Sequence, residues 1–177
     1  MVSQLALLGL GAGDVTHVAN SHFHFDHCGG NEFFPRATFL VQRPELEAAR
    51  RPGFVPGYSP SPIDFDHPLD YRTIDGEHDV FGDGTVILLP TYGHTPGHQS
   101  LLVRAGKGGR IVCASDACYT RENMGRDVLP NILWNASVMR DSLATLRKLR
   151  DQDGATMFYG HDPAQWDTIP RPPVPVV

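Results

Sequence analysis

His22-Phe23-His24-Phe25-Asp26-His27 brings three imidazoles and one carboxylate together within six consecutive residues. Imidazole nitrogens and carboxylate oxygens are the ligands with which proteins bind zinc and similar divalent metals at neutral pH. The whole chain has only 9 histidines among 177 residues, so this density is far above that of an ordinary polar loop. The stretch therefore predicts a metal site.

The composition is that of one globular domain, which we assign to residues 1–177 with a short N-terminal segment at 1–13 and a proline-rich tail at 163–177. Hydrophobic residues make up 41% and charged residues 20% of the chain, as in ordinary soluble proteins. The net charge of −5 argues against nucleic acid or an anionic membrane as a partner. Three cysteines without a CxxC pair predict free thiols and a cytoplasmic location.

Sequence periodicity predicts alternating strands and helices. The longest helix is predicted at 136–151, with Asn135 as its N-cap and Gly154 just beyond its end. Four apolar residues recur in it at helical spacing and predict core packing: Met139, Leu143, Leu146 and Leu149. A second helix is predicted at 44–51, before an irregular, proline-rich and functional loop at 51–70. Strands are predicted at 15–20, 37–41, 78–81, 85–90, 100–104, 110–114 and 155–159.

Three further metal-binding side chains follow predicted strands. His94 comes after the strand at 85–90, Asp116 after that at 110–114, and His161 after that at 155–159. A single histidine at a strand end is more often structural, but together with the first motif these residues are enough for two metal ions. Two divalent ions about 3.5–4 Å apart need a bridging ligand, and a water held between them has its pKa lowered towards ~7. The pattern therefore predicts a hydrolase site.

The motifs and their order resemble a known signature. HFHFDH, GHTPGHQSL, the aspartate at position 116 and FYGHD are similar to the signature of the metallo-β-lactamase superfamily. Within it, SHFHFDHCGGN and the stretch DACYTREN at 116–123 resemble the N-acyl homoserine lactonases, which are quorum-quenching enzymes. The similarity runs from about residue 14 to about residue 162. It implies an α/β fold, the αββα sandwich of that superfamily.

The resemblance also implies a ligand set for two divalent metals. Zinc is the first expectation, and Mn, Fe or Co also suit these nitrogen and oxygen donors. His98 stays outside both sites and is interpreted as structural, and neither Cys28 nor Cys118 is a ligand. One metal would be held by His22, His24 and His94, the other by Asp26, His27 and His161, with Asp116 bridging them.

The same resemblance implies hydrolysis of a small-molecule lactone by a metal-bridging hydroxide. Tyr119 would donate a hydrogen bond to the lactone carbonyl oxygen, and Asp26 would carry the proton to the leaving alkoxide. Phe25 and Tyr119 would line the substrate pocket. Phe23 would face either this pocket or the core.

One departure from the family pattern leaves other functions open. Several strands normally precede the first motif in this fold, whereas only 21 residues precede His22 here. We therefore expect an N-terminally truncated first half of the sandwich, which pairing in a homodimer would be one way to complete. The alternatives are a thioester hydrolase of the glyoxalase II type and a non-catalytic metal-binding fragment. Tyr119 and its Asp-Ala-x-Tyr context favour the lactonase.

Overall fold

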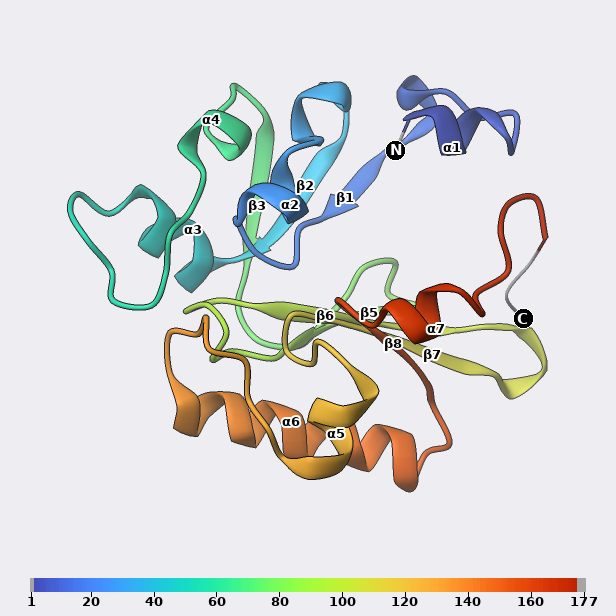
Figure 1. The fold of residues 1–177 in the computed structure, drawn as a ribbon. Helices are drawn as coiled ribbons and strands as arrows, with labels where there is room; N and C mark the ends of the chain where they lie inside the picture. The colour runs from blue at the N-terminus through green and yellow to red at the C-terminus, as the bar shows by residue number, and fades with distance from the viewer. Residues whose placement is uncertain (1, 175–177) are drawn as a thin grey trace.

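Two β-sheets lie face to face between two layers of helices in the computed structural model, which describes residues 2–174 (Figure 1). The first sheet has three parallel strands in chain order: β1 (His17–Ala19), β2 (Thr38–Gln42) and β3 (Asp70–Ile74). The second sheet has five strands, also in chain order: β4 (His78–Asp79), β5 (Val86–Pro90), β6 (Gln99–Arg104), β7 (Arg110–Ser115) and β8 (Thr156–Tyr159).

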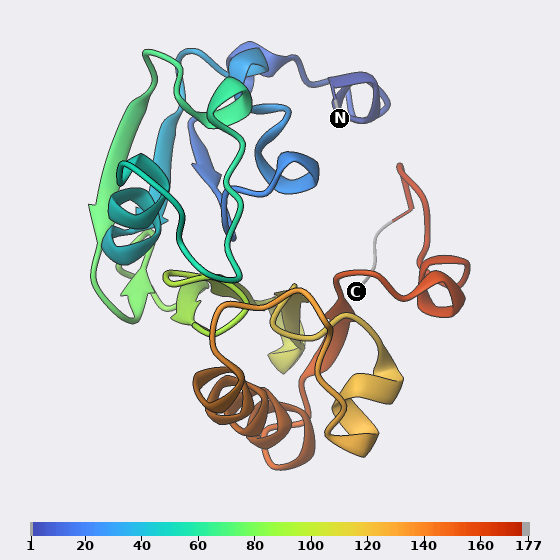
Figure 2. The ribbon, with the colours of Figure 1, turned by 60° about the vertical axis from the view of Figure 1, so that its left-hand side comes forward.

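Helices cover the outer face of each sheet (Figures 1 and 2). On the first sheet lie α2 (Phe25–Cys28), α3 (Arg43–Arg50) and α4 (Pro62–Phe65). On the second sheet lie α5 (Arg121–Arg126) and α6 (Ala136–Asp151). The remaining helices are α1 (Val2–Ala6) and α7 (Pro163–Trp166), with 3₁₀ turns at Ala12–Asp14, Asn31–Phe33 and Gly106–Gly108. The αββα sandwich is therefore the observed fold. In residues 2–174 no helix combines the length and the apolar character needed to cross a bilayer.

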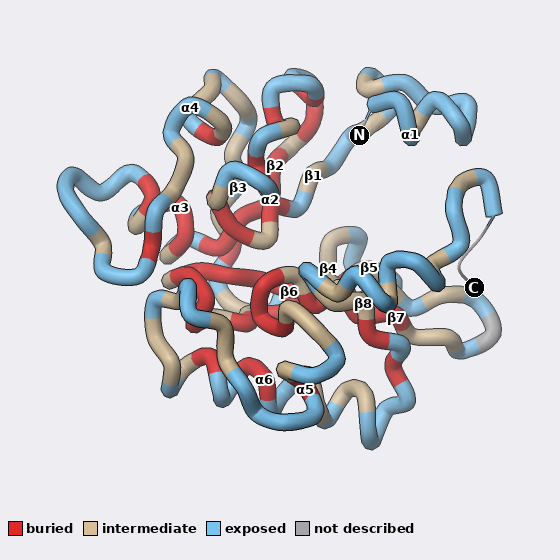
Figure 3. The backbone as a smooth tube through the Cα atoms, in the orientation of Figure 1, coloured by how far each residue is buried: buried red, intermediate tan, exposed pale blue. Residues whose placement is uncertain are grey.

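Alternation along β5 shows how the layers are joined. Ile87 and Leu89 point to the cluster formed with α6, whereas Leu88 packs against Leu40 and Ile74 of the first sheet. Successive side chains of a strand point to opposite faces, so one strand contributes to both interfaces. The core therefore lies in three layers: one between the sheets, one between the second sheet and α6, and one between the first sheet and its helices (Figure 3).

The helix predicted at 136–151 has those bounds in the structure. The Asn135 side-chain oxygen accepts hydrogen bonds from the main-chain nitrogens of Ser137 and Val138, as expected of an N-cap. The predicted apolar stripe faces the second sheet, where Leu146 has no exposed surface. Its packing role is thus confirmed.

Two segments show where the sequence signal was weak. β3 was not predicted, because it alternates exposed polar residues such as Asp70 and Arg72 with half-buried ones. The loop predicted at 51–70 is largely irregular but contains α4. In the predicted tail, residues 163–166 form α7, while 175–177 lie outside the described residues, as does position 1 of the N-terminal segment. The assignment of the whole chain to a single domain stays a prediction.

Candidate metal centre

The predicted metal ligands all follow the carboxyl ends of strands. β5, β7 and β8 run in the same direction, because β6 is antiparallel to β5 and β7 while β8 is parallel to β7. Their ends meet at one edge of the second sheet and carry His94, Asp116 and His161 there. Gln99 N donates to Ser21 O at 3.0 Å, which holds the histidine-rich motif after β1 against the same edge.

His22, His24 and His94 form the first ligand group. His24 Nδ1 lies 3.0 Å from His22 Nε2 and 3.1 Å from His94 Nε2. Zinc–nitrogen bonds of about 2.0–2.1 Å place ligand atoms about 3.3 Å apart at the corners of a tetrahedron. The three ring nitrogens therefore converge at a spacing that suits one metal ion.

Asp26, His27 and His161 form the second group, which lies nearer the solvent. Asp26 Oδ2 is 3.5 Å from His27 Nε2 and 3.7 Å from His161 Nε2. The side chains of Asp26 and His161 are 38% and 42% exposed, so this group can be reached from outside. Asp26 and His27 belong to α2, a single helical turn that begins directly after His24.

Asp116 lies between the two groups and directs one carboxylate oxygen at each. Its Oδ1 is 3.1 Å from His27 Nε2 and 3.2 Å from His161 Nε2. Its Oδ2 is 3.3 Å from His94 Nε2 and 4.0 Å from His22 Nε2. This is the geometry that a bridging carboxylate requires.

Two buried polar atoms at this point, His27 Nε2 and Asp116 Oδ1, lie 3.1 Å apart, but among the described residues neither has a partner in hydrogen-bond geometry. Buried polar atoms are nearly always satisfied, because an unsatisfied one costs desolvation free energy. Both atoms face the centre of the second group and both are metal donors. The donor set therefore fits two divalent ions.

The protonation states of His22, His94 and Asp116 suit metal binding. Burial lowers the pKa of His94 to about 4 and takes the pKa of His22 well below its ordinary value. Burial works against the charge of Asp116, but the surrounding imidazoles, His27 first, outweigh it and hold its pKa well below the usual range. Neutral imidazoles and an ionised carboxylate are the forms that coordinate metals.

Neighbouring groups orient these ligands. His94 Nδ1 donates to the main-chain oxygen of Ile132 at 3.0 Å, which leaves the Nε2 lone pair pointing into the first group. His98 Nε2 accepts from Asp116 N at 3.1 Å, and its Nδ1 is 2.9 Å from Thr91 Oγ1. Protein groups thus occupy both ring nitrogens of His98, in agreement with the structural role expected for it.

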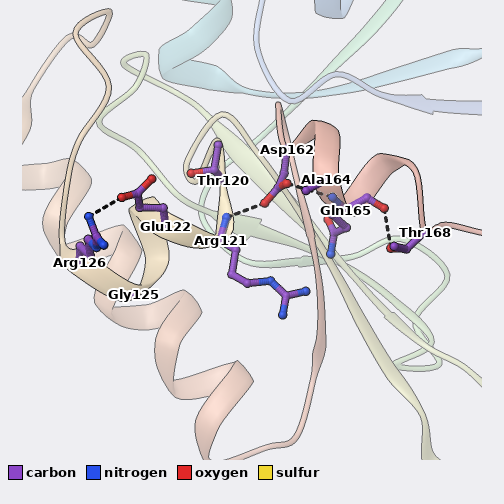
Figure 4. Close-up of a pocket in the computed structure, with 9 residues that line it drawn as sticks. All are labelled: Thr120, Arg121, Glu122, Gly125, Arg126, Asp162, Ala164, Gln165 and Thr168. Carbon is purple, nitrogen blue, oxygen red and sulfur yellow. Dashed lines mark hydrogen bonds and ion pairs between the residues drawn. The ribbon is translucent and has the colours of Figure 1, made fainter.

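The loops after β7 and β8 are tied to each other. His161 N donates to Tyr119 O at 2.8 Å, and a Cβ at Gly160 would collide with the Asp116 carboxylate. Asp162 accepts from Arg121 N at 2.8 Å and from Gln165 N at 3.0 Å, which links α5 to α7 beside a polar pocket of about 710 Å³ (Figure 4). That pocket is lined by residues that follow Asp116 and His161 in the chain, and by none of the seven predicted ligands. This link between α5 and α7 was not predicted, because in the sequence Asp162 is only the last residue of the motif Gly-His-Asp.

A second cavity, of about 770 Å³, opens directly onto the metal centre. Phe25 and Tyr119, the two predicted pocket residues, both line it, whereas Phe23 is fully buried and stacks on Phe65 with ring centroids 4.5 Å apart. Sequence reasoning missed other wall residues, because they come from loops without a motif. The cavity is lined by His24, Phe25, Asp26, Phe54, Gly57, Tyr58, Ser59, Asp116, Tyr119, Asn131, Ile132 and His161.

Comparison with known proteins identifies the family of this chain. Residues 1–161 match the model of the metallo-beta-lactamase superfamily. The N-acyl homoserine lactonase AttM of Azorhizobium caulinodans is 38% identical over 177 residues, covering 97% of this chain and 67% of the relative. The N-acyl homoserine lactonase AiiA of Bacillus thuringiensis subsp. kurstaki is 34% identical, covering 92% of this chain and 62% of the relative.

A solved structure gives the same result. The N-acyl homoserine lactone hydrolase with N-hexanoyl-L-homoserine bound at its catalytic metal centre superposes with a TM-score of 0.85 and 32% identity, over 98% of this chain and 66% of that one. The chain thus spans about two thirds of the length of the relatives it matches. It belongs to the metallo-beta-lactamase superfamily, where its relatives are N-acyl homoserine lactonases.

Proposed function

We propose that this protein is a metal-dependent hydrolase that opens the ring of N-acyl homoserine lactones or of a related small lactone. The observation that carries the proposal is the Asp116 carboxylate between two ligand groups, at the end of a cavity of substrate size. The activities named for the relatives support the same reaction class. The proposed metal ligands are His22, His24, His94, Asp26, His27, His161 and the bridging Asp116.

Divalent ions in these groups would lower the pKa of a water molecule and polarise the lactone carbonyl. Tyr119 would stabilise the negative charge that develops on the carbonyl oxygen. Burial and the nearby Asp116 charge raise the pKa of Tyr119, so its phenol stays protonated and can donate. Its ring centroid lies 5.7 Å from that of His94 and 4.8 Å from that of His161, between the two groups.

Asp26 would carry the proton. Its carboxylate borders the cavity within 4 Å of two ligand nitrogens, and it is exposed enough to exchange protons with solvent. A carboxylate in that position can take a proton from the attacking water and give it to the leaving alkoxide.

The cavity wall favours a lactone over the thioester alternative. Phe25, Phe54 and Ile132 are exposed apolar side chains along it, which suits an acyl chain. Among its described lining residues there is neither lysine nor arginine, the side chains that would pair with the carboxylates of a glutathione thioester.

We further propose zinc as the metal, a cytoplasmic location and a homodimer. Imidazole and carboxylate donors in tetrahedral spacing support zinc. The free thiols of Cys28, Cys113 and Cys118 support a reducing compartment. β1 lies at the edge of the first sheet, where a second copy could pair with it. Metal analysis and light scattering on the purified protein test the metal and the dimer.

The experiment for the function measures bound metal and then follows acid release from three substrates: an N-acyl homoserine lactone, γ-butyrolactone and S-lactoylglutathione. We expect about two metal ions per chain and turnover of the lactones, lost on chelation. Preference for the thioester would support the glyoxalase II alternative. Two bound metals without hydrolysis of any substrate would support the non-catalytic alternative.

A further inference from the structure

Glu45 is a carboxylate in the first half of α3 that has no exposed surface and belongs to neither ligand group. Glutamate is rarely buried completely, because removal of its charge from water is costly unless donors replace the lost hydration. Something in the structure must therefore compensate for its burial.

The compensation is four hydrogen bonds, two to each oxygen. Oε1 accepts from Phe23 N at 3.0 Å and from the Tyr58 hydroxyl at 2.6 Å. Oε2 accepts from the Thr95 hydroxyl at 2.6 Å and from Gly97 N at 2.9 Å. Burial raises the pKa of Glu45, while all four contacts lower it. None of these partners carries a charge.

Two of the four donors are sequence neighbours of the first ligand group. Phe23 stands between His22 and His24, and Thr95 directly follows His94. Both chain segments that supply the first ligand group are therefore bound to the same carboxylate. The loops that carry Asp116 and His161 make no hydrogen bond to it.

Close packing strengthens this link. A Cβ at Gly97 would collide with the main chain of Glu45, so the loop after His94 lies directly against α3. Tyr58, the fourth donor, also lines the cavity at the metal centre. α3 thus contacts a ligand loop of the second sheet through one side chain and through direct backbone approach.

We infer that Glu45 is a positioning residue for the first metal: it holds the His22–His24 segment and the His94 loop at the separation at which their ring nitrogens converge. The inference rests on the proposed ligand assignment and not on lactone hydrolysis. It distinguishes the two metals, because both segments that carry the first group are bound to Glu45, whereas for the second group only the histidine-rich motif is bound to it and the loops of Asp116 and His161 are not.

The substitution Glu45→Gln tests the inference with little change in shape. An amide has one acceptor oxygen, and its NH₂ group would face a hydroxyl and a main-chain N–H. The hydroxyl can turn to accept, but the buried N–H of Phe23 or Gly97 is left without a partner. Outer-shell partners of this kind change metal affinity by about 10–100-fold.

The measurement is Co²⁺ affinity, with visible absorption as the signal, in two single-site backgrounds. His161→Ala disables the second group, and His94→Ala disables the first. We expect Glu45→Gln to weaken Co²⁺ binding about 10–100-fold in the His161→Ala background and less than about threefold in the His94→Ala background. Equal losses in both backgrounds, or none in either, would overturn the inference.

A control variant and a replacement pair of variants complete the test. Glu47→Gln removes the same charge from an exposed site on α3 and should leave Co²⁺ affinity unchanged. If Glu45→Gln does not fold, Thr95→Val replaces it, and Thr95→Ser, which keeps the hydroxyl, should restore affinity. Equal affinities for Val and Ser at this position would refute the inference. No lactone is used, so absence of lactonase activity would count against the proposed function alone.

Discussion

Replacement of Asp116 by asparagine tests the bridging assignment most directly. Asparagine has nearly the same shape, but one of its two positions becomes an NH₂ group, which cannot ligate. In the structure one oxygen lies 3.1 Å and 3.2 Å from His27 and His161, and the other 3.3 Å from His94. Whichever group faces the NH₂ therefore loses one of its four proposed ligands.

The size of the effect follows from ligand number. Structural zinc sites with four ligands bind with about 10–16 kcal/mol, so one ligand corresponds to about 3 kcal/mol. That is about a hundredfold in affinity. Loss of the negative charge between two dications adds to this figure, because the Asp116 carboxylate would offset part of their repulsion.

The assay is a zinc titration against a competing chelator, with metal content measured after dialysis. We expect two zinc ions in the parent protein and at most one in Asp116→Asn, with lactone hydrolysis lost together with the second ion. Asp141→Asn, an exposed change on α6, is the matched control. Two ions bound with parental affinity in Asp116→Asn would refute the bridging role.

Three other perturbations test separate parts of the structure. Tyr119→Phe should lower kcat about a hundredfold with both metals retained, as removal of one oxyanion donor does; an unchanged kcat would exclude Tyr119 from the reaction. Leu146→Ala should lower the free energy of unfolding in urea by about 2–5 kcal/mol, because the side chain is fully buried between α6 and the second sheet. A decrease of less than about 1 kcal/mol would contradict this packing. In the metal-free protein, burial holds the pKa of His94 at about 4 and that of His98 at about 3, against an ordinary value of 6.5. The unfolded chain therefore binds protons that the folded chain does not. When the pH falls from 7 to 5, each of these two histidines should lower the free energy of unfolding by about 2 kcal/mol. His27, whose pKa is raised, acts in the opposite sense, so urea unfolding in chelator that shows no net loss towards pH 5 would contradict the dominance of the buried histidines.

Local patterns predicted much of the fold and the site. The long helix was predictable because its N-cap and its apolar stripe recur in consecutive turns. The gathering of the candidate ligand side chains at one place was predictable because these imidazoles and carboxylates follow strand ends. β3 was not, since its half-exposed alternation resembles a polar loop. The burial of Glu45 was not predictable either, because a glutamate on an amphipathic helix is expected to face the solvent. Its four donors come from distant segments and meet only in the folded protein.

The cavity wall shows the same limit. The loop at 51–70 could be predicted to be functional from its length and prolines, but not that Phe54 and Tyr58 would be its contribution. Which side chains of an irregular loop face a cavity depends on backbone turns that no periodicity encodes. The role of Ile132 was also not predictable, because no motif surrounds it in the sequence. Its main-chain oxygen orients His94, and the residue also lines the cavity.

The ligands come from both sheets, and this has a mechanical consequence. The histidine-rich motif follows a strand of the first sheet, whereas His94, Asp116 and His161 follow strands of the second. Bound ions would therefore act as cross-links between the two halves of the sandwich, and neither half could unfold without breaking coordination bonds. Chelation should therefore lower the temperature of thermal unfolding measured by calorimetry, because the bound ions would stabilise the contact between the two sheets in addition to their proposed role in the reaction.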